Sequence, residues 1–220
     1  MAREEVTAQE RLNDVHSRID RACAAVKRDP AGVTLIAVSK TKTIEAIQEL
    51  YDLGQRHFGE SRLQEALPKI EALPKDIIWH FIGPLQSNKA KRAAESFPII
   101  HTLYKPSQIS EISKVQGSVE GLIEINVGQE AQKAGIFIQE LDDLLPIILE
   151  CKTVQFRGLM TIGPALADAE AMRPYFREVR EANERIRGQW LSMGMSHDFE
   201  VALMEGATHV RIGSALFGER

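Results

Sequence analysis

Short apolar runs alternate with helical segments along the whole chain, and this alternation constrains the fold more than any other feature. Eight runs have the composition of buried strands, at residues 34–40, 56–60, 77–83, 99–103, 121–127, 155–160, 191–196 and 209–213. Strands that alternate with helices predict a parallel sheet whose neighbouring strands are joined by helical crossovers.

The segments between these runs are amphipathic or rich in helix-forming residues. We expect helices over residues 43–53, 87–96, 107–116, 138–149 and 167–187. Another helix precedes the first strand, because Thr7 and Glu10 have capping-box spacing. Apolar residues then recur at helical spacing, at Leu12, Val15, Ile19, Cys23 and Val26.

The number of units favours a closed barrel over an open sheet. Eight units in 220 residues occupy about 27 residues each, which suits a compact (β/α)8 barrel. A doubly wound open sheet shows the same alternation, but the count of eight favours the barrel. We find no linker, low-complexity tract or repeat, so residues 1–220 are predicted to form a single α/β domain, a TIM barrel with an N-terminal helix.

Composition and charge exclude several function classes. A formal net charge of −4 argues against nucleic acid and membrane surfaces as partners, and the basic cluster at 89–92 reads as a solvated helix face. Cys23 and Cys151 lie far apart, which indicates neither a disulfide framework nor a zinc site. No apolar stretch approaches the roughly 20 residues of a membrane span. We therefore expect a cytoplasmic protein, and a monomer.

Lys40 is the leading candidate for chemistry because it ends the first apolar run. It shares strand parity with Ile36 and Val38, so its amine points into the barrel mouth if those two side chains point inward. Burial lowers the pKa of a lysine and leaves an amine able to attack a carbonyl and form a Schiff base. On position alone, a Lys40 that begins the following loop and is solvated is favoured, because lysine is rarely fully buried.

Glycine and serine follow the last two strands, where barrels of this type often hold a phosphate. The segments are SMGMS at 192–196 and RIGSALFG at 211–218. Glycines allow close approach of an anion, and serine hydroxyls and free N–H groups supply donors. With a lysine that forms imines, such a cradle suits either pyridoxal phosphate or the phosphorylated sugar of an aldolase.

Six segments together resemble the pyridoxal phosphate homeostasis protein family, and the match runs nearly end to end. They are AVSKTK at 37–42, FGESRLQE at 58–65, WHFIGPLQSNK at 79–89, GLM at 158–160, LSMGMS at 191–196 and VRIGSALFG at 210–218. The segments occur in the family's order and at compatible spacing. Together they indicate the family strongly, although several of the segments would be weak indicators alone.

The resemblance implies a barrel similar to the N-terminal domain of alanine racemase, with pyridoxal 5'-phosphate held as a Schiff base on Lys40. It also implies phosphate contacts from Ser196, Gly213 and Ser214, with Arg211 near the phosphate or the ring. The family is associated with the balance of vitamin B6 and amino acids, without robust catalytic turnover. Ser61 stands where relatives carry asparagine and offers one donor instead of two.

A slow amino-acid racemase is the alternative function. Racemisation needs a base on each face of the substrate, and we expect no second domain after Arg220 to provide one. A neighbouring subunit or a helix-borne tyrosine such as Tyr104 could supply it instead. Free amino acids are expected partners in either case, because they react with an imine.

Three other residues compete for a catalytic role. Ser196 and His197 are adjacent but lack the nucleophile-elbow pattern. His80 lies inside an expected strand, where a core histidine is favoured over a proton donor. Lys42 lies in the loop beyond Lys40 and is expected to remain hydrated at the surface.

Overall fold

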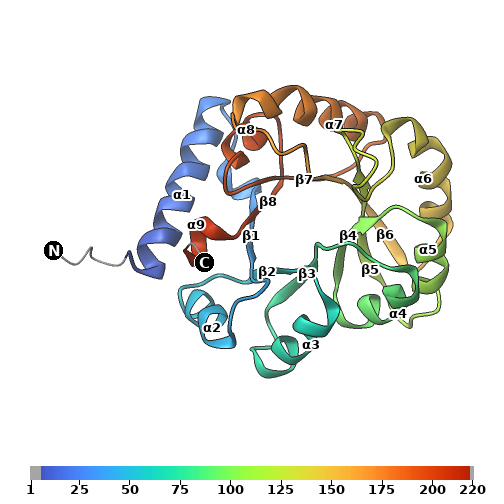
Figure 1. Cartoon of the computed structure of the whole chain (residues 1–220), viewed down its shortest axis with the longest axis horizontal. Coiled ribbons are helices and arrows are strands. Elements are labelled where there is room, and N and C mark those ends of the chain that lie inside the picture. The colour runs from blue at the N-terminus through green and yellow to red at the C-terminus, as the bar shows by residue number, and fades with distance from the viewer. Residues whose placement is uncertain (1–5, 219–220) are drawn as a thin grey trace.

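The structure is a computed structural model that describes residues 6–218, and its eight strands close into a barrel in sequence order (Figure 1). All neighbouring strands are parallel, including β8 with β1, where Leu35 pairs with Val210. The strands are β1 (Thr34–Val38), β2 (His57–Glu60), β3 (Ile78–Phe81), β4 (Ile99–Leu103), β5 (Val119–Ile125), β6 (Val154–Thr161), β7 (Trp190–Met195) and β8 (His209–Ile212). The barrel prediction is confirmed, and the β1–β8 pairing excludes the open sheet.

Helices surround the strands on the outside of the barrel (Figure 1). The α-helices are α1 (Ala8–Ala25), α2 (Ile44–Asp52), α3 (Leu63–Ala72), α4 (Ser87–Ser96), α5 (Pro106–Ile112), α6 (Leu141–Glu150), α7 (Arg173–Arg185), α8 (Phe199–Met204) and α9 (Ser214–Phe217). Short 3-10 turns are η1 (Pro30–Gly32), η2 (Ile138–Glu140) and η3 (Glu170–Met172). The sequence did not predict α3, which contains Pro68, nor α8 and α9, which are six and four residues long.

The N-terminal helix α1 lies beside the last helices, where the barrel closes. Its capping box is present, since Thr7 Oγ1 accepts from the Glu10 N–H and Glu10 accepts from the Thr7 N–H. Arg18 forms an ion pair of 2.9 Å with Glu200 of α8, and Arg11 Nε donates to the Leu216 carbonyl of α9. These contacts hold α1 against the part of the barrel where β8 pairs with β1.

The two faces of the sheet differ in chemistry. Leu35 and Ala37 belong to the large apolar core between the strands and the helices. Ile36 and Val38 have the opposite parity and face the barrel axis. Besides a small apolar cluster, the interior holds buried polar side chains, namely His80, His101, Ser192, His209 and Arg211. This interior is more polar than the layers of Val, Ile and Leu usual in such barrels.

In the part of the chain that the structure describes, no helix combines the length and apolarity of a membrane span. Both cysteines are free, Cys23 buried and Cys151 half-buried. The structure thus agrees with the expectation that neither takes part in a disulfide.

Candidate functional site

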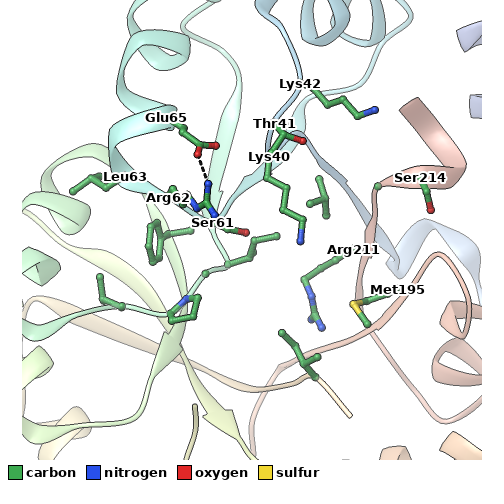
Figure 2. A pocket seen from close by; sticks show the side chains of 18 of the residues that line it. Lys40, Thr41, Lys42, Ser61, Arg62, Leu63, Glu65, Met195, Arg211 and Ser214 are labelled. Carbon is green, nitrogen blue, oxygen red and sulfur yellow. Dashed lines mark hydrogen bonds and ion pairs between the residues drawn. The ribbon is translucent and has the colours of Figure 1, made fainter. Parts of the chain in front are cut away.

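A pocket of about 1030 Å³ opens at the carboxyl ends of the strands (Figure 2). Its walls come from the ends of β1, β2, β3, β6, β7 and β8 and the segments that follow them. All five residues expected at the site line this pocket, namely Lys40, Ser196, Arg211, Gly213 and Ser214. The fold therefore gathers residues that are up to 174 positions apart in the sequence, from Lys40 to Ser214.

Lys40 reaches the pocket from a turn, so the solvated loop position that the sequence favoured on position alone is confirmed, and the buried strand-end position is not. β1 ends at Val38, and Lys40 is exposed in the turn that follows Ser39. The protein alone therefore does not desolvate its amine by burial. The side chain is nevertheless directed into the pocket, toward the space that Arg211 faces from β8 (Figure 2).

The turn separates Lys40 from its competitor, Lys42. It is closed by a hydrogen bond of 3.0 Å from the Lys42 N–H to the Ser39 carbonyl. Thr41 has a φ of 63°, a left-handed conformation that is unfavourable for a β-branched residue. Lys42 is half-buried rather than fully hydrated, with its Nζ 5.5 Å from the centre of the Phe217 ring. A cation–π contact thus occupies the Lys42 ammonium.

A buried ion pair holds the residue before Lys40. Ser39 is fully buried, and its hydroxyl donates to Glu60 Oε1 at 2.7 Å. Lys69 of α3 donates to the same Oε1 at 2.7 Å and to the Ser39 carbonyl at 2.9 Å. The Ser39 N–H donates to the Gly59 carbonyl. The backbone that carries Lys40 is therefore fixed by a charged side chain from a helix that the sequence did not predict.

The loops after β7 and β8 meet at a cluster of donors. Ser196 Oγ accepts from the N–H of Gly213 at 3.2 Å and from that of Ala215 at 3.5 Å. Ser214, between them, is exposed and lines the pocket. Two hydroxyls therefore lie at one corner of the pocket, and two backbone N–H groups point at one of them. These groups suit an anion such as phosphate when it takes the place of the bonds to Ser196.

Arg211 forms the inner wall of the pocket. The residue is only 4% exposed, and its guanidinium donates to Ser192 Oγ at 2.6 Å and to the Thr161 carbonyl at 2.8 Å. Burial lowers the pKa of Arg211 to about 10, an effect that the negative charges of Asp198 and Glu124 partly offset. Arg211 therefore stays cationic at neutral pH.

Glu124, on β5, is a further charged group in the interior. Burial raises its pKa to about 7, and the positive charge of Arg211 partly counteracts this shift. Its Oε2 is buried without a hydrogen-bond partner among the described residues. In the sequence, Glu124 stands out as a carboxylate inside an apolar strand run, but it was not among the predicted site residues.

The competing residues do not form a catalytic pair, although His197 also lines the pocket. His197 is exposed, and its Nε2 lies 3.1 Å from the Ala167 carbonyl rather than against Ser196. Tyr104 lies in the loop after β4, not on a helix as expected. His80 is fully buried and bonded to two other histidines, so the core position favoured by the sequence is confirmed.

Ser61 lines the pocket beside an obligatory glycine. A Cβ at Gly83 would collide with the backbone oxygen of Ser61, so only glycine allows the segments after β2 and β3 to approach so closely. Together, the pocket offers a primary amine, a phosphate-sized set of donors and a cationic inner wall. This combination suits a phosphorylated carbonyl compound.

Comparisons with known proteins agree with this chemistry. The family model described as "Alanine racemase, N-terminal domain" matches residues 9–220. The pyridoxal phosphate homeostasis protein of Aquifex aeolicus is 44% identical over 226 residues, covering 98% of this chain and 99% of the relative. The protein of the same name from Pseudomonas aeruginosa is 40% identical and covers 97% of this chain and 96% of its own.

A solved structure extends the similarity to three dimensions. PipY of Synechococcus elongatus, in a structure with PLP bound, is 35% identical and superposes with a TM-score of 0.82. The match covers 96% of this chain and all of PipY. Sequence and structure therefore point to the same group of proteins.

Proposed function

The chain belongs to the family of pyridoxal phosphate homeostasis proteins, within the fold of the alanine racemase N-terminal domain, and we propose that it holds pyridoxal 5'-phosphate as a Schiff base on Lys40. The observation that carries this proposal is the direction of the Lys40 side chain, into a pocket that phosphate donors also line (Figure 2). The PLP-bound structure of PipY supports pyridoxal phosphate over the phosphorylated sugar of an aldolase.

The residues present fit this cofactor. Lys40 would supply the amine that holds the cofactor through its aldehyde carbon, with loss of water. Ser196, Gly213 and Ser214 hold the phosphate through hydroxyl and backbone donors at their corner of the pocket. Arg211 is fixed by Ser192 and Thr161 on the inner wall and presents positive charge to the ring or the phosphate. When bound, the cofactor supplies an aldehyde that reacts reversibly with primary amines.

We infer that the protein stores and exchanges the cofactor, with free amino acids as its small-molecule partners, and thereby contributes to vitamin B6 and amino-acid homeostasis. Lys40 is exposed in its turn, so an incoming amine has access to it. Tyr104, the tyrosine named as a possible second base, is not among the residues that line the pocket, whereas His197 and Lys42 line it. The proposal of a role without robust turnover, over the alternative of a slow amino-acid racemase, is supported by the homeostasis proteins among the relatives.

Titration of the purified protein with pyridoxal phosphate tests the proposal. A pyridoxal imine absorbs in the near ultraviolet and visible range, and we expect it to form with one cofactor per chain. The variant Lys40→Ala should lose this absorbance and keep its fold. Lys42→Ala is the matched control and should retain it. Equal imine formation in both variants would contradict the assignment to Lys40.

A further inference from the structure

A chain of hydrogen bonds runs from Arg211 through the barrel interior to its opposite end. Arg211 Nη1 donates to Ser192 Oγ at 2.6 Å, and Ser192 Oγ lies 2.9 Å from His101 Nδ1. His101 Nε2 lies 2.9 Å from His80 Nδ1, and His80 Nε2 lies 3.0 Å from His57 Nδ1. We call Ser192, His101, His80 and His57 the histidine column.

The column joins two openings of the protein. Arg211 lines the pocket at the carboxyl ends of the strands. His57 is the first residue of β2 and lines a second pocket of about 910 Å³, formed by residues at the amino ends of the strands. His80 and His101 between them are fully buried, as is Ser192.

Each histidine in the column carries a single N–H. Burial lowers the pKa of His57 and holds the pKa values of His80 and His101 well below the ordinary value, so all three rings are neutral at pH 7. A neutral imidazole has one donor nitrogen and one acceptor nitrogen. Each contact in the column therefore needs a donor on one side and an acceptor on the other.

Arg211 determines the direction of the whole column, because a guanidinium only donates. Ser192 accepts from Arg211 and keeps its own hydroxyl hydrogen. Among the described residues, His101 Nδ1 is the acceptor that this buried hydrogen reaches. His101 then carries its hydrogen on Nε2 and donates to His80 Nδ1. His80 in turn donates from Nε2 to His57 Nδ1, which places the hydrogen of His57 on Nε2.

We propose that the histidine column positions Arg211 at the pocket through a single one-way chain of hydrogen bonds, with all three rings in the Nε2–H form. The role of Arg211 toward a ligand rests on the proposed function, whereas the direction of the column does not. The Ser192 bond and the Thr161 bond are the two that hold the guanidinium. The column fixes the bond to Ser192. Ser192 Oγ accepts from Arg211, and its own hydroxyl hydrogen finds a partner only if His101 Nδ1 is an acceptor.

The direction of the column is directly measurable. The chain has six histidines, and nitrogen-15 NMR of the full-length protein distinguishes the two neutral tautomers of each ring. We expect the Nε2–H form at His57, His80 and His101, with or without added pyridoxal phosphate. An Nδ1–H or charged ring at His80 or His101 would overturn the proposal, even if Lys40 binds the cofactor as proposed.

Two variants test whether the column acts as a unit. Ser192→Ala removes the link to Arg211, and we expect His101 and His80 both to lose their single tautomer. His57→Leu removes the acceptor for His80 at the far end and should change the same two rings. If Ser192→Ala changed only the tautomer of His101, and His57→Leu only that of His80, the rings would not be coupled. His57 is half-buried, so this variant serves if Ser192→Ala does not fold.

The cofactor reports whether the column positions Arg211. We expect Ser192→Ala to shift the absorbance maximum of the bound cofactor and to weaken its retention roughly three- to tenfold. Thr208→Ala is the control, because its hydroxyl bonds Leu191 and His209 rather than the column. Among the histidines, this variant should alter the tautomer of His209 alone. A Ser192→Ala protein with altered tautomers but unchanged absorbance and retention would refute the positioning role.

Discussion

Lys69 and Glu60 form an ion pair inside the protein, with Nζ 2.7 Å from Oε1, and both also bond to Ser39. Glu60 is fully buried and Lys69 is 8% exposed. Removing one partner leaves the other charge buried and uncompensated. We therefore expect Lys69→Met to destabilise the fold by about 3–5 kcal/mol. Thermal denaturation should show a midpoint lowered by roughly 6–20 °C.

The control for this prediction is Lys75→Met, because Lys75 is exposed and its ammonium bonds only backbone carbonyls near the end of α3. Its midpoint should change little. Adding Glu60→Gln to Lys69→Met removes the stranded charge and should recover part of the loss. A Lys69→Met protein as stable as the Lys75→Met protein would show that the pair does not hold the Ser39 turn.

The phosphate cradle gives a second prediction. Ser196→Ala removes a hydroxyl next to the Gly213 N–H, and Ser214→Ala removes one at the pocket surface. Each lost bond to a charged phosphate is worth roughly 1.5–3 kcal/mol, or about one to two decades in affinity. Equilibrium dialysis should therefore show weaker cofactor retention with the imine still formed. Ser110→Ala, on an exposed face of α5, is the control. Unchanged affinity in the double variant would place the phosphate elsewhere.

Glu124 makes the stability depend on pH. Its pKa is raised from 4.5 to about 7, first by burial. Between these values the folded state keeps a proton that the unfolded state has lost, so this group lowers stability as the pH rises through that window. Glu124→Gln stays neutral throughout. The free energy of unfolding of Glu124→Gln should exceed that of the parent by close to zero at pH 4.5 and by about 3 kcal/mol above pH 7.

Urea unfolding at a series of pH values measures this difference. Glu71→Gln is the control for loss of a carboxylate at an exposed position. If the difference in stability between Glu124→Gln and the parent does not change with pH, Glu124 does not carry a raised pKa in the folded protein.

Racemase activity is expected to be absent at enzyme-like rates. One amine can serve one face of a bound amino acid, and each general acid or base typically contributes 10²–10⁴-fold. Incubation with L-alanine in deuterium oxide, followed by mass and chiral analysis, tests this. Steady formation of D-alanine that disappears in Lys40→Ala would establish the racemase alternative.

The sequence was sufficient to predict the barrel, because each strand run is apolar and five of the seven crossovers were recognised as helical. All eight predicted strands are present, each shifted by a few residues at most. The helix α3, which has Pro68 in its interior, was not predicted, although α6 was predicted with Pro146 at a similar interior position. The helices α8 and α9 are too short to show a full apolar period.

The site was only partly predictable. Lys40 and Ser196 were found because motifs at strand ends mark the mouth of a barrel. The Lys69–Glu60 pair joins a helix to a strand end, and no spacing pattern in the sequence indicates which lysine meets which carboxylate. The bond between Arg211 and Ser192 likewise depends on the register of β7 and β8, which begins to shift after Ser192 and His209. Such contacts become visible only when the barrel is closed.

The most direct test of the account is to trap the cofactor on the protein. Pyridoxal phosphate is bound to the full-length chain, the imine is reduced with borohydride, and the modified peptide is sequenced by mass spectrometry. We predict one pyridoxyl group per chain, on Lys40. A label on Lys42, or one spread over surface lysines with no preference for Lys40, would contradict the central claim.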